Sequence, residues 1–214
     1  MESRKFSIPL EKNPLIVMHA TPGHFTTSNS HVNHFLDLDD MKSNAPIARD
    51  VAQELATPYI ASTLIETIVC MEGTEVVGAY LAEELIKEGM SLFTNDGNIH
   101  VLTPIRTLSG NLMFQKSTQE WIFDKSILLV VASVCGGSTM KRALECMSFY
   151  GGKVVGISAL FCNITGKRGK EINALFTCDD IPSYQVWKPN ECELCKAGKK
   201  IDAIVSSEGY TEMS

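Results

Sequence analysis

The chain has 214 residues, 44% of them hydrophobic and 21% charged, which are values typical of a globular protein with a buried core. The formal net charge is −6 and no long basic run occurs, which argues against nucleic acid as a main partner. No window approaches about 18 uninterrupted apolar residues, and the N-terminus lacks the apolar stretch of a signal peptide, so we expect no membrane contact and no secretion.

The seven cysteines are an odd number, and most of them lie in aliphatic segments. This pattern is typical of a reduced protein rather than of a disulfide framework. We therefore expect a cytoplasmic location.

Strand-like and helix-like hydrophobic periods alternate along the chain, as in an α/β protein with a parallel sheet. Helices are predicted from about 45 to 57, over 74–87 and over 139–150. Strands are predicted over 64–70, 99–104, 127–132, 153–161 and 172–176, and a β-hairpin or flap over 111–124. The predicted fold is a mostly parallel central sheet flanked by helices.

This pattern divides the chain into three segments. Residues 1–40 are expected to form a small N-terminal hood, and residues 41–178 the α/β core. Pro182, Pro189 and a Ser-rich end predict an irregular C-terminal tail over 179–214 that packs on the core. For the tail we expect Trp187 and Ile201 to provide the apolar contacts with the sheet.

A strand, a short polar turn and a helix follow one another around residue 135. The backbone N–H groups of such a turn and the positive end of the following helix favour a phosphate group. The alternative is a tight turn of any α/β fold, in which glycine relieves backbone strain. The predicted phosphate-binding residues are Cys135, Gly136, Gly137, Ser138 and Thr139.

The strand and turn at Ile127–Thr139 resemble the phosphoribosyl-diphosphate signature of the type I phosphoribosyltransferases. The segment Pro22–Leu38 is similar to the N-terminal part of orotate phosphoribosyltransferases, and Met71–Thr74 stands where the family has its diphosphate loop. The resemblance implies a phosphorylated small molecule as partner, Mg²⁺ carried with the diphosphate, and a homodimer. It also implies a base pocket of Phe25, Thr26, His31, Asn33 and Phe35, and diphosphate contacts from Glu72, Gly73, Thr74, Arg106 and Lys116. Thr74 can equally be read as a helix cap.

The departures from the family concern catalysis. Val131 and Ala132 stand where the family has its acidic pair, and an unpaired ribose hydroxyl there would cost roughly 1–3 kcal/mol. The Lys-rich, His-containing catalytic loop expected after Arg106 is absent. The catalytic residues are therefore unknown.

Three functions stay open. The sequence favours a phosphoribosyltransferase of the orotate type, acting on a pyrimidine-like base. The alternative is a catalytically degenerate protein that binds a nucleotide or phosphosugar in a regulatory role. A third reading, an interaction protein, rests only on the cysteines of the tail.

Two groups of residues were considered as metal ligands. Cys192 and Cys195 have the spacing of half a zinc site, for which Cys162 and Cys178 are the nearest further thiols. Because a second Cys-x-x-Cys pair is missing, we expect no structural zinc. The histidines at 24, 31 and 34 have no carboxylate or thiol at metal-like spacing, so no metal is predicted there either.

Overall fold

The structure, a computed structural model, describes residues 2–60, 62–87, 98–135, 138–164, 172–206 and 209–213. The chain divides into two units. Unit 1 comprises Met1–Leu38 and Phe176–Ser214, and unit 2 comprises Asp39–Leu175. None of the described helices is long and apolar enough to cross a membrane.

The parallel sheet of unit 2 confirms the predicted α/β fold. Its strand order is β10-β9-β8-β4-β5, and the pairs β9–β8, β8–β4 and β4–β5 are parallel. The continuous aliphatic runs of β4 and β8 fit this arrangement, because strands covered on both faces need apolar residues throughout. The bounds are β4 Thr67–Cys70, β5 His100–Leu102, β8 Ser126–Val134, β9 Lys153–Cys162 and β10 Asn173–Thr177.

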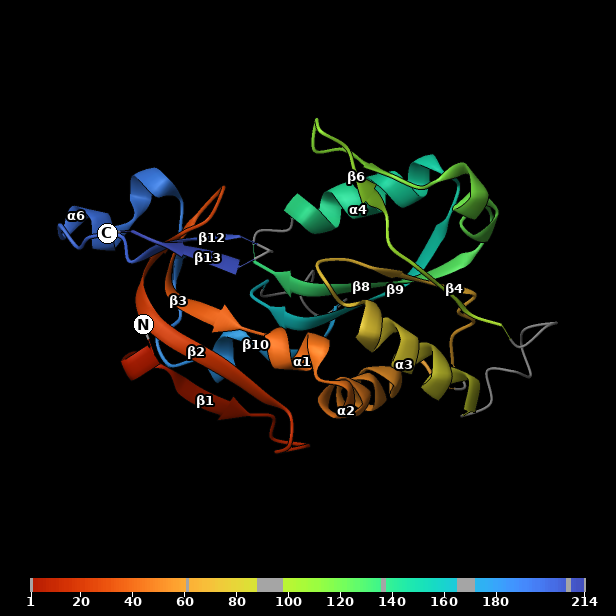
Figure 1. Cartoon of the computed structure of the whole chain (residues 1–214), viewed down its shortest axis with the longest axis horizontal. Helices are drawn as coiled ribbons and strands as arrows, with labels where there is room; N and C mark the ends of the chain where they lie inside the picture. Colours follow the sequence, from red (N-terminus) through yellow and green to blue (C-terminus); the bar gives the residue numbers. More distant parts are fainter. Residues whose placement is uncertain are drawn as a thin grey trace. The chain divides into compact units, whose positions relative to one another are not determined.

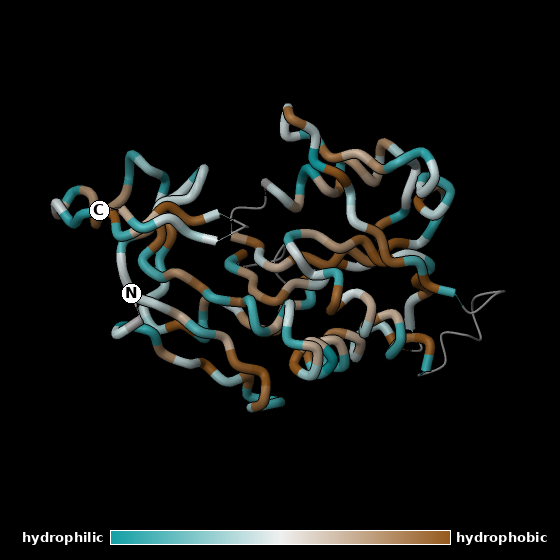
Figure 2. The backbone as a smooth tube through the Cα atoms, in the orientation of Figure 1, coloured by the Kyte–Doolittle hydropathy of each residue, from teal (hydrophilic) through white to brown (hydrophobic). Residues whose placement is uncertain are grey.

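Helices cover both faces of this sheet (Figure 1). Helices α2 (Ala45–Ala56) and α3 (Glu75–Lys87) lie on one face, and α4 (Ser138–Phe149) lies on the other. On the α4 face, Ala143 and Met147 join the buried cluster that contains Leu129. Figure 2 shows the hydrophobic residues gathered along the central strands of this unit.

The segment after β5 differs in part from the predicted hairpin over 111–124. Strand β7 (Leu112–Met113) does form a hairpin, but its partner is the upstream strand β6 (Ile105–Arg106). Residues Lys116–Trp121 form the 3₁₀ helix η3 instead of a second strand. The residues whose alternation suggested a strand thus form a helical turn. Phe114 and Ile122, which flank this turn, are buried in the hydrophobic core.

Unit 1 is a six-stranded sheet built from both of its stretches. Strands β11-β3-β2-β12-β13 follow in this order, and β1 also pairs with β2. The strand bounds are β1 Phe6–Pro9, β2 Val17–Thr26, β3 His31–Asp37, β11 Val186–Trp187, β12 Ala203–Ser206 and β13 Gly209–Glu212. The short helices of this unit are η1 Glu2–Arg4, η4 Cys178–Asp180, η5 Pro189–Glu191 and α6 Glu193–Lys196. The short helix α1, Asp39–Ser43, belongs to unit 2.

The C-terminal stretch is thus more regular than the irregular tail that we predicted. Strand β12 pairs in parallel with β2, and β11 pairs with β3. These pairings satisfy backbone groups that β2 and β3 would otherwise leave open at their edges. Trp187 lies opposite His31, and Phe25, Val32 and Ala203 form one buried hydrophobic cluster of the unit.

Candidate functional site

The loop between β4 and α3 carries one group of predicted ligands. Glu72 and Gly73 both have left-handed backbone conformations, with φ of 61° and 83°. Thr74 is fully buried, and its hydroxyl lies 2.9 Å from the carbonyl of Met71 and 3.2 Å from that of Val130. Since these carbonyls can only accept, the Thr74 hydroxyl anchors the loop to the middle of β8.

The carboxylate of Glu72 reaches across to β8. Its Oε2 accepts a hydrogen bond of 3.3 Å from the backbone N–H of Ser133. Burial raises the pKa of Glu72, and this effect is opposed by the Ser133 N–H, the charges of Arg106 and Lys42, and the Thr139 hydroxyl. Strands β4 and β8 are parallel neighbours, so their carboxyl ends meet here. We call Glu72, Lys42, Arg106, Ser133 and Thr139 the Glu72 cluster.

The predicted phosphate turn lies between β8 and α4. Helix α4 begins at Ser138, and the Thr139 hydroxyl acts to lower the pKa of Glu72. Cys135 follows β8 and is partly exposed. Gly136 and Gly137 lie outside the described residues.

The positions of the missing acidic pair are not open to a ligand. Val131 is 1% exposed and Ala132 is 6% exposed, and Val131 belongs to the hydrophobic cluster between β8 and α4. At this end of β8 the polar group available to Glu72 is the backbone N–H of Ser133, which the sequence did not single out.

The two predicted cations differ in their placement. Arg106, in β6, acts on Glu72. Lys116 is exposed at the start of η3 and is not among the charges that act on Glu72. Lys42 in α1 takes that place; its ammonium also pairs with Asp39 at 2.8 Å. No sequence pattern pointed to Lys42, because packing alone brings it to Glu72.

The residues predicted for a base pocket all lie in unit 1. Phe25 is fully buried in the core of this unit, and Phe35 packs against it with ring centroids 6.1 Å apart. Thr26 Oγ1 donates to the carbonyl of Thr27 at 3.2 Å. Asn33 Nδ2 donates to the carbonyl of Ser183 at 2.6 Å. A base pocket here stays a prediction.

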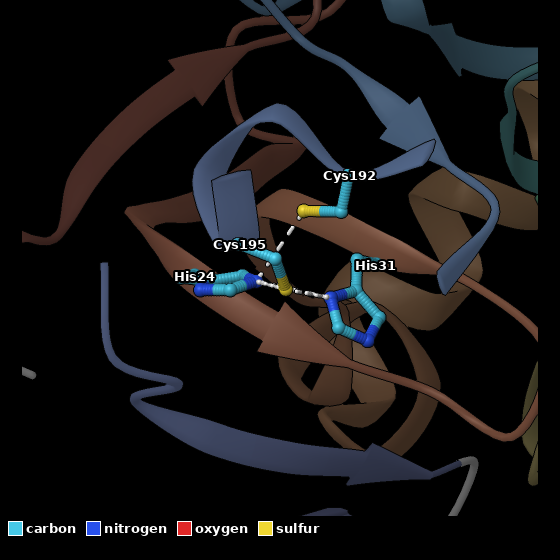
Figure 3. A group of neighbouring side chains, drawn as sticks. All are labelled: His24, His31, Cys192 and Cys195. Atoms are coloured by element: carbon cyan, nitrogen blue, oxygen red, sulfur yellow. Dashed lines mark hydrogen bonds between the residues drawn. The ribbon is translucent and has the colours of Figure 1, made fainter. Parts of the chain in front are cut away.

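The fifth base-pocket residue, His31, belongs to a group that the sequence analysis did not assemble. His24, His31, Cys192 and Cys195 place one potential ligand atom each within 4.8 Å of all the others (Figure 3). Burial lowers the pKa of His31, and the neighbouring His24 lowers it further. Of the other two cysteines that we considered, Cys178 is not in this group, and Cys162 belongs to unit 2.

The signal for this group was present in the sequence but incomplete. Cys192-x-x-Cys195 was recognised as half a site, whereas the two histidines were set aside because no thiol lies near them in the chain. Thr26 pairs with His31 in the β2–β3 hairpin, and His24 precedes Thr26 by two residues. His24 lies in the irregular stretch of β2 between Pro22 and Phe25, where the pairing register shifts, and the fold brings its Nε2 to 3.0 Å from His31 Nδ1.

Comparison with known proteins gives one similar sequence and one solved structure of similar fold. The chain is 27% identical over 191 residues to an orotate phosphoribosyltransferase of Wolinella succinogenes, covering 83% of this chain and 87% of the relative. The UMP synthase structure of Leishmania donovani superposes with a TM-score of 0.54 at 18% identity, over 75% of this chain. The chain matches only 34% of that longer protein. No protein-family profile matches the chain. The resemblance inferred from the sequence is confirmed.

Proposed function

Because the chain is a relative of the type I phosphoribosyltransferases, we propose that it transfers ribose 5-phosphate from phosphoribosyl diphosphate to a pyrimidine-like base. The relative from Wolinella succinogenes is an orotate phosphoribosyltransferase, which favours orotate as the base. The observation that carries the proposal is the Glu72 cluster. It combines a carboxylate, two cations and the start of α4 at the carboxyl ends of two parallel strands, where ligands of α/β sheets bind.

Four members of the cluster have a task in this reaction. The Glu72 carboxylate can accept hydrogen bonds from the ribose hydroxyls, which Val131 and Ala132 cannot do. Lys42 and Arg106 can offset the charge of the diphosphate as it leaves. The hydroxyl of Thr139 and the N-terminal N–H groups of α4 can hold the 5′-phosphate.

Mg²⁺ is expected to enter with the diphosphate, for which the oxygen ligand of Glu72 has the right chemistry. When bound, the ion would neutralise charge on the leaving group. The protein itself supplies orientation and a preformed electrostatic environment for the positive charge that develops at the sugar. A homodimer is part of the proposal and can be measured by light scattering.

A second function is favoured by the same cluster. In this arrangement Glu72 already accepts from Ser133 and contacts Thr139, so donors that a phosphorylated ligand needs are engaged by the protein. A protein that binds a phosphorylated nucleotide or sugar without turnover needs these donors for the phosphate, but it needs no catalytic carboxylate. In this case the Glu72 side chain would turn away on binding.

Glu72→Gln separates the two functions. If the chain is an enzyme, orotate consumption with phosphoribosyl diphosphate and Mg²⁺ should be measurable, and the substitution should lower kcat/KM by roughly 10- to 100-fold, the effect of losing a charged hydrogen bond. The matched control is Glu145→Gln on the exposed face of α4, which should leave the rate unchanged. Absence of turnover by the wild type, together with calorimetric binding of phosphoribosyl diphosphate, would support the binding protein. Absence of both would refute the proposal.

A further inference from the structure

The ligand atoms of the four-residue group in unit 1 have the separations of a metal site. His24 Nε2 lies 3.0 Å from His31 Nδ1 and 3.5 Å from the sulfur atoms of both Cys192 and Cys195. The Cys195 sulfur lies 3.3 Å from His31 Nδ1. A tetrahedral zinc ion would require about 3.4 Å between two nitrogens, about 3.6 Å between nitrogen and sulfur and about 3.8 Å between two sulfurs. The measured distances are close to these values.

Hydrogen bonding alone does not account for the packing around His24. Its Nδ1 lies 2.8 Å from the carbonyl oxygen of Lys199, and because a carbonyl can only accept, this nitrogen carries the proton. The neutral ring then leaves a single lone pair on Nε2. Three groups, His31 Nδ1 and the two thiols, crowd around that lone pair. One of them can donate well to it, whereas a cation at the centre would engage all four.

The surroundings match those of a protein metal ligand. A histidine ligand generally donates its other N–H to a carbonyl or carboxylate, which fixes the tautomer and the ring orientation. The contact of His24 with Lys199 supplies this bond. His24, His31 and Cys192 are buried, and only Cys195 is exposed. The short helix α6, with Cys192 as its N-cap, places both thiols toward the hairpin (Figure 3).

We propose that His24, His31, Cys192 and Cys195 bind one Zn²⁺ ion as a structural site. Two thiolates and two imidazoles are a ligand set that zinc prefers, and four protein ligands leave no position for a substrate. The ion would join the β2–β3 hairpin to α6 within unit 1. Our expectation from the sequence, that the chain binds no zinc, is thereby reversed. None of the four ligands belongs to the Glu72 cluster, but His31 is also a residue of the predicted base pocket, and as a zinc ligand it would not be available to contact a base.

Elemental analysis of the full chain, purified without chelator, tests the proposal. The wild type should retain about one zinc per chain. Cys195→Ser should lose most of the zinc, because it removes one of the four ligands. This ligand is chosen because its thiol is exposed, so that its replacement disturbs the core least. The matched control is Cys178→Ser, also in unit 1 but outside the group, which should retain the zinc.

Cobalt gives a second readout that needs no variant. Wild-type protein stripped with chelator and reloaded with Co²⁺ should develop the visible absorption of a tetrahedral site with thiolate ligands. Removal of the metal should lower the thermal midpoint by roughly 10 °C, and Zn²⁺ but not Mg²⁺ should restore it. This measurement decides the matter if Cys195→Ser does not fold.

Several results would overturn the proposal. Folded wild-type protein with neither zinc nor a tetrahedral cobalt spectrum would mean that the four residues form a metal-free cluster. Equal loss of zinc from Cys178→Ser and Cys195→Ser would place the ion elsewhere. Retention of iron in place of zinc would refute the identity of the ion.

Discussion

His24 and Asp202 exchange two short hydrogen bonds although they lie 178 residues apart. The backbone N–H of His24 donates to the Asp202 carboxylate at 2.7 Å, and the N–H of Asp202 donates to the carbonyl of His24 at 2.7 Å. The same carboxylate accepts from Arg4 at 2.7 Å. Asp202 therefore fixes the backbone at one of the proposed zinc ligands.

Asp202→Ala should weaken zinc binding without removing a ligand. Loss of a group that orients a metal ligand typically costs 10- to 100-fold in affinity, and we expect roughly 10-fold here. Competition with a chromophoric chelator measures the effect. Arg4→Ala is the control, because it removes the ion pair and leaves the two hydrogen bonds to His24. If both substitutions weaken binding equally, the backbone of His24 is not held in this way.

Glu66 should make the stability of unit 2 depend on pH. Burial alone would raise the pKa of Glu66, but hydrogen bonds from the Ser126 N–H at 2.9 Å and the Lys125 ammonium at 3.0 Å outweigh it, so the pKa is lowered. A lowered carboxyl pKa stabilises the folded state above the ordinary pKa of glutamate, and this contribution is lost as the pH falls through the lowered value.

Glu66→Gln should therefore reduce the free energy of unfolding by about 1–2 kcal/mol at neutral pH, the scale of a charged hydrogen bond. The difference in unfolding free energy between the variant and the wild type should shrink as the pH falls below the ordinary pKa of glutamate and through the lowered pKa of Glu66. Urea unfolding at neutral and at acidic pH measures it, with Glu145→Gln as an exposed control. A difference that is the same at both pH values would contradict the assignment.

Gly78 allows α3 to approach β4 closely. A Cβ atom at this position would collide with the sulfur of Cys70 and lie 3.2 Å from Cγ1 of Val101. Gly78→Ala should thus destabilise the protein by about 1–2 kcal/mol, because overpacking outweighs the gain in helix propensity. The double variant with Cys70→Ala should recover stability, since it removes the colliding atom. Thermal unfolding of both variants tests this, and a stabilised single variant would disprove it.

Val131→Glu should unfold the core rather than restore a catalytic acid. The side chain is 1% exposed in the hydrophobic cluster, so a carboxylate there would lose its hydration without gaining a partner. We expect a loss of more than about 3 kcal/mol. Val155→Glu, at a strand position that is 41% exposed, is the control and should be tolerated. Wild-type stability of Val131→Glu in urea would show that the position is open.

Hydrophobic pattern predicted the five strands of the main sheet of unit 2 but missed β6 of that unit and the strands of unit 1. Strands β8 and β9 are long, mainly aliphatic runs, and such runs are typical of buried strands. In the C-terminal stretch, β11 has two residues and β12 four, which is too short for any period to be seen. Their strand character depends on pairing with β2 and β3, partners that are distant in sequence.

The same division holds for the candidate sites. Thr139 was predicted because it adjoins a recognisable helix start, and Glu72 because Met71–Thr74 resembles the diphosphate loop of the family. Lys42 and Ser133 were missed, because their proximity to Glu72 depends on how α1 and β8 pack. His24 and Cys192 lie 168 residues apart, and no local spacing rule relates them.

The division of unit 1 into two stretches has a consequence for the order of events during synthesis. Unit 2 is continuous, so its strands and helices can find one another while the chain is still growing. The β2–β3 hairpin is made earlier and can pair with β1, yet its two imidazoles must wait for the thiols of the C-terminal stretch. Zinc therefore has no complete site in the nascent chain, and metal loading is a late step that a cell starved of zinc would leave unfinished in otherwise folded molecules.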